Sequence, residues 1–334
     1  MIQHAVQRVS ESVDLTREES FEVMGEIADG RATAAQVGAL LLGLRLKGET
    51  AEEITGAAMM MRARLERVRV DAGVFVDTCG TGGDGSNTFN ISTTAAFVVA
   101  AAGVTVAKHG NRSVSSRCGS ADVLEALGVA VDGGRSVAED CISKVGIGFL
   151  FAPHHHPAFK AVGAIRRELG VRTIFNLLGP LANPALARHQ VLGVYHPKWV
   201  PVVAEVLVSL GSLRAFVVHG QGLDEISLGG TTSVAEVRNG RVVSYEVSPE
   251  ELGLPRCDVS ALLGGDAAHN ARMVRDVLGG QKGPPRDMVL ANAAAALVAA
   301  DAAEDFRHGI RLAASAIDAG QALAKLQALV EQTR

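Results

Sequence analysis

The sequence predicts an α/β protein with a small all-helical domain over residues 1–67 and a larger domain over residues 68–334 that has a mainly parallel central sheet. Three observations support this prediction. The 334 residues are enough for about two domains of roughly 150 residues each. Up to residue 67, apolar residues recur only at helical spacing. From residue 68 onward, short apolar runs alternate with helical stretches.

Composition excludes several classes of protein. The formal charge of −4 provides no overall attraction to nucleic acid or to an anionic membrane. The longest uncharged apolar stretches, near 95–107 and 288–300, are shorter than the ~20 residues of a membrane-spanning helix. The first thirty residues lack a signal-like apolar run, so we expect a cytoplasmic protein. The four cysteines form no CxxC pair, and we expect them to be small buried hydrophobes rather than disulfide or zinc ligands.

The first domain is predicted from helix-start signals. Three capping boxes occur in succession: Thr16 with Glu19, Thr33 with Gln36, and Thr50 with Glu53. Apolar residues follow each box at helical spacing, and short turns at Gly30 and Gly48 join the helices. Gly38, Ala39 and Gly43 permit close helix approach, so the face that carries them is a candidate dimer surface.

The second domain is predicted from alternation. Candidate strands lie at 74–76, 104–107, 147–151, 190–194 and 215–218, with helices near 94–102, 120–127, 136–145 and 198–210. This order indicates a parallel sheet with right-handed crossovers. Asn239-Gly240 separates two further strand-like runs, 233–237 and 241–247, and predicts a hairpin. Ser248-Pro249 opens a short helix, and the tail from Asp266 onward is helical and alanine-rich.

A glycine-rich loop, residues 80–85, follows the first of these strands and precedes a helix that begins near Asn90. Strand, glycine loop and helix place backbone N–H groups and a helix N-terminus against a phosphate. The loop contains GxGxxG, but a dinucleotide-binding fold also needs an acidic residue at the end of the next strand, where this chain has Lys108-His109. We predict a phosphate-rich site here, and a plain tight turn is the alternative.

Residues 219–225, with the sequence HGQGLDE, follow the strand at 215–218. On a loop loosened by glycine, Asp224 and Glu225 can both turn toward one hard cation. Oxygen ligands suit Mg²⁺, which also shares a substrate's phosphates. We therefore predict a metal site, and a solvated acidic turn is the alternative.

Two other segments are less informative. Three consecutive histidines, 154–156, cannot all face one metal in regular structure, so we expect loop or core histidines there. Arg166 or Arg167 could bind a carboxylate bidentately, but spacing alone favours a solvated helix face or a pair with Glu168.

Four motifs, taken in order, carry a resemblance to a known family. They are GTGGDG followed by NIST, then KHGNRSVSSRCGSADVLEALG, then RRELGVRTIFNLLGPLANPA, and finally HGQGLDEIS. Over nearly the whole chain, the sequence resembles the anthranilate phosphoribosyltransferase family of tryptophan biosynthesis. The resemblance implies transfer of the phosphoribosyl group of 5-phosphoribosyl 1-pyrophosphate (PRPP) to the amine of anthranilate. The products would be N-(5′-phosphoribosyl)anthranilate and pyrophosphate.

The resemblance also implies a structural frame. The fold would be that of the nucleoside phosphorylases and phosphoribosyltransferases, and a segment at about 165–187 would return to the helical domain. Two Mg²⁺ ions would bind in each active site. The partners would be the two small-molecule substrates and a second copy of the chain, docked through the helical domain, with neither nucleic acid nor membrane.

By the same resemblance, magnesium is held by Ser92, Asp224 and Glu225, with Glu225 shared between the two ions. Anthranilate meets Gly80, Asn111 and Arg166, and the arginine faces its carboxylate. Lys108, Asp224 and Glu225 act in catalysis, because they neutralise charge on the departing pyrophosphate directly or through the metal. The residues implied in PRPP binding are Gly80, Gly83, Asp84, Thr88, Asn90, Ile91, Ser92, Thr93, Lys108, His109, Gly110, Asn111, Arg112, Ser113, Val114, Ser115, Ser116 and Ser120.

Three other functions stay open at this point. A nucleoside phosphorylase, whose pyrimidine-specific members resemble this fold, would release a base with phosphate and would not need PRPP. An NAD(P) dehydrogenase would need an acid where Lys108-His109 stands. A nucleic-acid-binding relative would need a concentrated basic groove, and the charge of −4 argues against one.

Overall fold

The computed structural model describes residues 1–113 and 117–334, so Val114, Ser115 and Ser116 of the implied PRPP set lie outside the described residues. Residues 1–67 are described in full and contain four helices: α1 (Ile2–Ser10), α2 (Arg17–Ala28), α3 (Ala34–Lys47) and α4 (Ala51–Ala63). The three predicted capping boxes are present at the starts of α2, α3 and α4. Each threonine hydroxyl accepts from the third residue's amide, whose side chain returns to the threonine N–H.

In the described residues, seven strands form one sheet in the order β3-β2-β1-β4-β5-β6-β7. The strands are β1 (Phe75–Gly80), β2 (Thr105–Gly110), β3 (Ile147–Phe151), β4 (His189–Gly193), β5 (Arg214–Gly220), β6 (Thr232–Arg238) and β7 (Arg241–Val247). β1 to β5 pair in parallel, and β6 and β7 are antiparallel. The predicted hairpin at Asn239-Gly240 is confirmed, with φ of 50° and 76° at its two central residues. The predicted fold class is therefore confirmed.

The strand order reverses at β1, because the chain builds β2 and β3 on one side of it and then crosses to β4 and β5 on the other. The carboxyl ends of β1, β2, β4 and β5 consequently share one edge of the sheet. In open α/β sheets, ligands bind outside this edge at the point of reversal. Both β1 and β2 extend further than predicted, since their pairing continues through Gly80 and Gly110.

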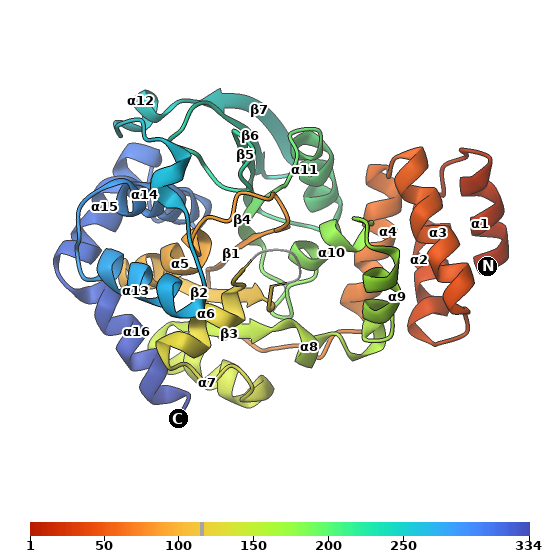
Figure 1. The fold of residues 1–334 in the computed structure, drawn as a ribbon, viewed down its shortest axis with the longest axis horizontal. Coiled ribbons are helices and arrows are strands. Elements are labelled where there is room, and N and C mark those ends of the chain that lie inside the picture. The colour runs from red at the N-terminus through yellow and green to blue at the C-terminus, as the bar shows by residue number, and fades with distance from the viewer. Residues whose placement is uncertain (114–116) are drawn as a thin grey trace.

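Strand residues alternate between two hydrophobic cores. Val76, Val106 and Phe216 point into a core with α5 (Ile91–Ala101) and α14 (Pro284–Ala299). Leu192, Val217 and their neighbours point the other way, toward α11 (Trp199–Ser209), α10 (Phe175–Leu181) and the N-terminal helices. Figure 1 shows these helices on the two sides of the sheet. The remaining helices are α6 (Ser120–Leu127), α7 (Gly134–Val145), α8 (Ala152–His155), α9 (Val162–Leu169), α12 (Pro249–Leu252), α13 (Ala267–Leu278), α15 (Phe306–Asp318) and α16 (Gln321–Gln332), with short 3-10 turns at Pro157–Phe159 and Val259–Leu262.

α9 and α10 lie against the N-terminal helices rather than over the sheet alone (Figure 1). The Arg62 guanidinium of α4 donates to the Leu181 carbonyl at 2.7 Å, and Arg45 of α3 donates to the Arg172 carbonyl at 2.8 Å. These contacts support our division of the chain, in which the segment near 165–187 belongs with the helical domain; that division stays a proposal. In the described part of the chain, no helix is both long enough and apolar enough to cross a membrane.

Candidate active site

The glycine loop and the acidic loop meet at the carboxyl edge of the sheet. The Gly82 amide donates to the Asp224 carboxylate at 2.7 Å, although 142 residues separate the two in sequence. The Asp224 amide in turn donates to the Asp84 carboxylate at 3.3 Å. Two motifs that were predicted separately therefore form one site.

This meeting depends on two glycines that pair with each other across β1 and β4, Gly80 and Gly193. A Cβ on Gly80 would lie 2.3 Å from Asp224 Oδ2, and a Cβ on Gly193 would lie 1.5 Å from the Asp224 backbone oxygen. Any side chain at either position would occupy the space of Asp224. The absence of side chains on two adjacent strand ends thus lets the acidic loop cross the edge of the sheet.

The acidic side chains are crowded and partly desolvated. Burial raises the pKa of Asp224 and of Glu225 above the usual carboxyl range, and the neighbouring acid (Asp84 for the first, Asp224 for the second) raises it further. Such raised values indicate that negative charge here lacks sufficient compensation from the protein itself. A divalent cation would supply that compensation.

Lys108 is the cation that the chain does place beside these acids. It is 4% exposed, and its Nζ donates to the Thr78 carbonyl and to Ser92 Oγ, the latter at 3.4 Å. Burial lowers the pKa of the Lys108 ammonium, and its acidic neighbours, first Asp77 and then Glu225 and Asp224, oppose that effect. The ammonium thus lies between the end of β1 and the start of α5.

The N-terminus of α5 faces the same site. The Ser92 amide in its first turn donates to Glu225 Oε1 at 3.1 Å, so a carboxyl oxygen lies where a helix N-terminus favours an anion. Ile91 and Thr93, both buried, flank Ser92. Ser92, Asp224 and Glu225 are therefore brought together with Lys108.

Among the described residues, no group of three or more His, Cys, Asp or Glu side chains is arranged to enclose a metal ion. The two acids and the Ser92 hydroxyl offer oxygen ligands without enclosing an ion. This donor set fits Mg²⁺, which keeps waters and completes its coordination with substrate phosphates. It does not fit zinc, which favours nitrogen and sulfur ligands.

His109, next to Lys108 on β2, points to the opposite face of the sheet. Its amide donates to the buried Asp77 carboxylate at 3.1 Å, and its ring nitrogens contact the Gly179 carbonyl at 3.1 Å and the ring of His156 at 3.2 Å. Burial lowers the pKa of His109 well below its usual range, and His156 adds to the effect. The ring is therefore neutral, with partners at both nitrogens.

The other implied PRPP residues line the rim of the same edge. Asn90 donates to the Cys118 carbonyl at 3.2 Å, and Ser120 Oγ donates to the Asn111 carbonyl at 3.2 Å, so the ends of the 111–120 segment are held near α5. Thr88 is close to Ser86, which binds Asp84, while Gly83 accepts from Arg172 through its carbonyl. Gly110 has no room for a side chain, because a Cβ there would lie 2.3 Å from Ser120 Oγ.

Arg112 and Ser113 are turned toward α6. The Arg112 guanidinium binds Glu125 at 2.5 and 2.6 Å, and the Ser113 amide donates to Asp122 at 3.0 Å. In this structure, the Arg112 side chain is thus engaged on α6 rather than in the cluster around Lys108.

Arg166 and Arg167 differ in their surroundings. The Arg166 guanidinium is half-buried, with its carbon 5.5 Å from the centre of the Phe175 ring, whereas Arg167 is exposed. Within residues 1–113 and 117–334, no carboxylate forms an ion pair with Arg166. α10, which carries Phe175, also supplies the Gly179 carbonyl that His109 contacts. Arg166 is therefore an unpaired cation on the segment that approaches the sheet edge.

Comparisons with known proteins agree with this geometry. A family model described as "Glycosyl transferase family, a/b domain" matches residues 72–323, and one described as "Glycosyl transferase family, helical bundle domain" matches residues 3–65. An anthranilate phosphoribosyltransferase of Anaeromyxobacter sp. (strain K) is 66% identical over 333 residues, covering 100% of this chain and 99% of the relative. The chain belongs to the anthranilate phosphoribosyltransferase family.

Solved structures of the family share the fold. The anthranilate phosphoribosyltransferase of Thermus thermophilus superposes with a TM-score of 0.94 at 44% identity, covering 99% of both chains. The Saccharomyces cerevisiae enzyme, solved in complex with PRPP and Mg, superposes with a TM-score of 0.89 at 28% identity, covering 99% of this chain and 97% of the yeast chain.

Sequence reasoning missed several residues that shape this family site. Gly193 lacked any signal, since it stands in an ordinary apolar run, and its role depends on a neighbour 31 residues later in the chain. The three consecutive histidines go to different partners: His154 to Asp132, His155 to the Glu66 carbonyl and His156 to His109. Of the three, only His156 contacts a residue of the implied PRPP set, His109.

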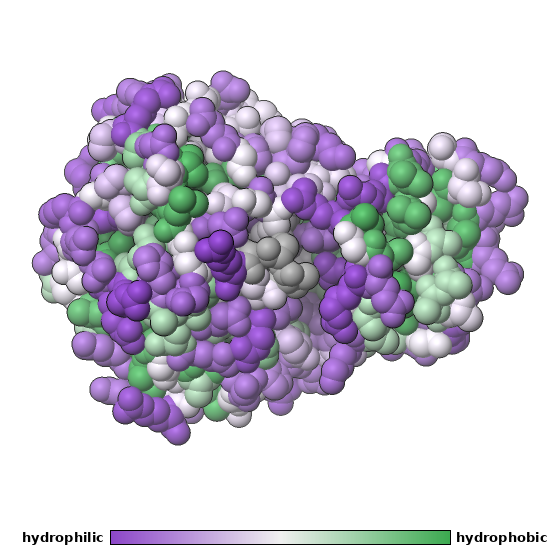
Figure 2. Space-filling model, in the orientation of Figure 1, coloured by the Kyte–Doolittle hydropathy of each residue, from purple (hydrophilic) through white to green (hydrophobic). Residues whose placement is uncertain are grey.

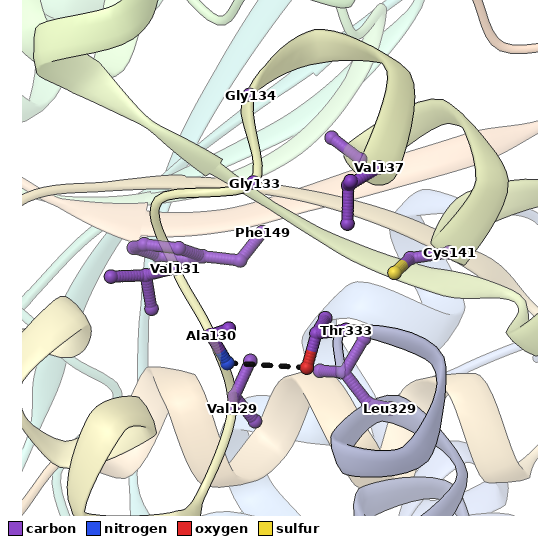
Figure 3. Close-up of a pocket in the computed structure, with 11 residues that line it drawn as sticks. Val129, Ala130, Val131, Gly133, Gly134, Val137, Cys141, Phe149, Leu329 and Thr333 are labelled. Atoms are coloured by element: carbon purple, nitrogen blue, oxygen red, sulfur yellow. Dashed lines mark hydrogen bonds between the residues drawn. The ribbon is translucent and has the colours of Figure 1, made fainter.

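The surface around the site differs from the other hollows of the molecule. Figure 2 shows the surface hollowed between the larger part and the helical part, with hydrophilic residues around the hollow. A separate pocket lies between α7, β3 and the end of α16, where the Ala130 amide donates to Thr333 Oγ1 at 3.1 Å (Figure 3). None of the described residues that line it is charged, whereas Lys108, Asp224 and Glu225 stand at the sheet edge.

Proposed function

We propose that this chain transfers the phosphoribosyl group of PRPP to the amine of anthranilate, giving N-(5′-phosphoribosyl)anthranilate and pyrophosphate. The observation that carries the proposal is the contact between the glycine loop and Asp224, because it joins a phosphate-binding loop to metal-binding acids in one place. The relatives that match over the full chain have this activity in their name, and the yeast relative binds PRPP and Mg.

The chemistry requires stabilisation of a leaving group. As the N–C1′ bond forms, the C1′–O bond to pyrophosphate breaks, and the ring oxygen supports positive charge at C1′. Mg²⁺, when bound, neutralises charge on the pyrophosphate. Lys108 supplies a fixed ammonium at the same place, and the amides of the glycine loop orient the phosphates. We propose Ser92, Asp224 and Glu225 as the metal ligands, with Glu225 between two ions.

Anthranilate binds on the opposite wall in this proposal. The unpaired Arg166 guanidinium faces its carboxylate, with Gly80 and Asn111 beside the ring. The aryl amine is a neutral nucleophile, so positioning matters more than a strong base. His109 is a poor proton acceptor, because both of its ring nitrogens are already engaged in the protein.

We also propose that two copies associate through the helical domain. Leu42 and Leu46 of α3 are exposed, Leu46 by 78%, as is Met59 of α4. Figure 2 shows hydrophobic residues gathered over this part of the molecule. The expected contribution of Gly43 needs revision, because a Cβ there would lie 2.5 Å from Val9 of α1, so this glycine serves packing within the protomer. Light scattering of wild type and Leu46→Glu tests the association: a smaller mass for the variant supports it, and an unchanged mass contradicts it.

The activity is tested with the purified chain, PRPP, MgCl₂ and anthranilate. The fluorescence of anthranilate should fall while pyrophosphate is released in equal amount, and neither should occur without metal. Glu225→Gln should lower turnover most strongly at limiting magnesium, whereas Glu250→Gln, at an exposed position of α12, is the matched control. Phosphate-dependent release of a base from a pyrimidine nucleoside, with no release of pyrophosphate from PRPP and anthranilate, would instead indicate a phosphorylase.

A further inference from the structure

A tight turn precedes the two acidic residues of the site. The Gly220 amide donates to the Leu223 carbonyl and the Leu223 amide donates to the Gly220 carbonyl, both at 3.0 Å. The two residues between them, Gln221 and Gly222, have φ of 48° and 84°. Two left-handed residues inside a reciprocal hydrogen-bonded pair are typical of a type I′ turn, which costs a non-glycine residue such as Gln221 some conformational energy.

The ring of His219, the residue before this turn, contacts it directly. His219 is 8% exposed, and its Nδ1 lies 2.7 Å from the Val194 carbonyl oxygen, which can only accept. The Gly222 amide lies 3.3 Å from Nε2 and can only donate. One neutral tautomer satisfies both contacts, with the proton on Nδ1 and a free electron pair on Nε2. His219 therefore joins the end of β4 to the turn.

Only Leu223 separates Gly222 from Asp224, whose backbone crosses above Gly193. The Asp224 carboxylate accepts a hydrogen bond from the Gly82 amide, and the Glu225 carboxylate accepts one from the Ser92 amide. Leu223 is 2% exposed and its backbone is hydrogen-bonded to Gly220, so we expect a change in the turn to move these carboxylates. We propose that His219 is a positioning residue for the metal site, holding the Gly222 amide so that Asp224 and Glu225 present their oxygens together; this inference rests on the proposed function.

The chain contains a matched comparison for His219. His189, at the opposite end of β4, is also 8% exposed, and its Nδ1 contacts the Ala299 carbonyl at 2.8 Å. It shares burial and a bond to a carbonyl with His219 but lies at the sheet edge away from the acidic loop. Replacing His189 therefore measures the general cost of losing a buried imidazole.

Two substitutions separate the two contacts of His219. His219→Asn keeps a donor near the Nδ1 position for the Val194 carbonyl and loses the acceptor for the Gly222 amide. His219→Gln places a side-chain oxygen near the Nε2 position and keeps that acceptor. Each variant, together with His189→Asn, is assayed for kcat, for the KM values of Mg²⁺ and PRPP, and for thermal unfolding. Binding of Mn²⁺ in the presence of PRPP, followed by the paramagnetic resonance signal of free Mn²⁺, gives a readout independent of turnover.

We expect His219→Asn to raise the Mg²⁺ KM and to weaken Mn²⁺ binding by about tenfold, the effect of about one lost hydrogen bond. His219→Gln should restore both to within about threefold of wild type. His189→Asn should lower the unfolding temperature without changing either metal constant. Equal metal constants in wild type and His219→Asn would overturn the proposal.

If His219→Asn does not fold, His219→Gln decides, and a tenfold loss of metal affinity in that folded variant would overturn the proposal. Failure of the proposed function is a different result, since wild type would then release no pyrophosphate from PRPP and anthranilate. If wild type is active and the His219 variants keep its Mg²⁺ KM and Mn²⁺ affinity, only the positioning role is contradicted.

Discussion

Replacing Gly193 with alanine should displace the acidic loop by a distance that can be stated. The new Cβ would lie 1.5 Å from the Asp224 backbone oxygen, whereas ordinary contacts begin near 3.4 Å, so the two must separate by roughly 2 Å. β4 cannot retreat, because Gly193 pairs with Gly80 of β1 on one side and with Val218 of β5 on the other. The loop that carries Asp224 must therefore move.

A displacement of this size should affect catalysis more than stability. Misplacement of a catalytic group by about 1 Å can cost about 10²-fold in rate, so kcat/KM should fall by about 100-fold or more. Overpacking of this kind costs about 1–3 kcal/mol in stability, which a cooperatively folded chain of this size can tolerate. The Mg²⁺ concentration needed for half-maximal rate should also rise.

The assay compares Gly193→Ala with Gly73→Ala, using anthranilate fluorescence across a range of MgCl₂ and urea unfolding for each protein. Gly73 lies before β1, and a Cβ there would meet nothing within 4 Å, so this control adds the same methyl group harmlessly. If Gly193→Ala keeps wild-type kcat and Mg²⁺ dependence, the claim that Asp224 needs the space above Gly193 is wrong.

The remaining predictions concern the substrates and pH. Lys108→Met, which preserves volume, should lower kcat/KM for PRPP by about 10²–10³-fold with the circular dichroism spectrum unchanged; wild-type PRPP kinetics would remove Lys108 from the phosphate site. Arg166→Ala should raise the anthranilate KM about tenfold or more and leave that of PRPP nearly unchanged, while Arg167→Ala should do neither; the reverse pattern would shift the assignment by one residue. Burial lowers the pKa of His156 to about 4, so its folded form binds no proton until well below the ordinary value of 6.5. The unfolded chain binds that proton first, and stability should fall by roughly 2 kcal/mol between pH 8 and pH 5 on this account. The acids of the metal loop, with raised pKa, act in the opposite direction. The measurement is therefore urea unfolding of wild type and of His156→Asn at both pH values. The free energy of unfolding should fall by roughly 2 kcal/mol less in His156→Asn than in wild type.

Local signals predicted the helical domain well. A capping box involves only four consecutive residues. Those that begin at Thr16, Thr33 and Thr50 therefore predict helix starts without knowledge of the rest of the fold. Strand lengths were less accessible. The strand predicted at 104–107 stops short of Lys108 and His109, which the sequence places only at its end. Both residues pair with β3, because a strand buried between two others accepts polar side chains that find partners above and below the sheet.

The candidate site was predictable as motifs and not as geometry. The sequence marked Asp84, Asp224 and Lys108 as chemically unusual, but pairing across 142 residues leaves no local trace. Nor could spacing decide between Arg166 and Arg167, since neighbours on a helix point about 100° apart and the partner surface decides which one is covered. In the structure, Arg166 packs over the Phe175 ring and Arg167 is exposed, which supports the choice of Arg166 that the KM measurements test.

The core that includes α11 extends without interruption from the sheet into the N-terminal helices. α4 packs on α11 and α10 as well as on α2. Its apolar residues therefore belong to the core of both parts, and neither part could expose this surface to water alone. A boundary drawn near residue 67 divides the sequence, but it does not divide the hydrophobic interior. Removal of the first 67 residues would leave an exposed apolar surface on the remainder, which would then be prone to aggregate. The two segments should therefore unfold together in a single thermal transition.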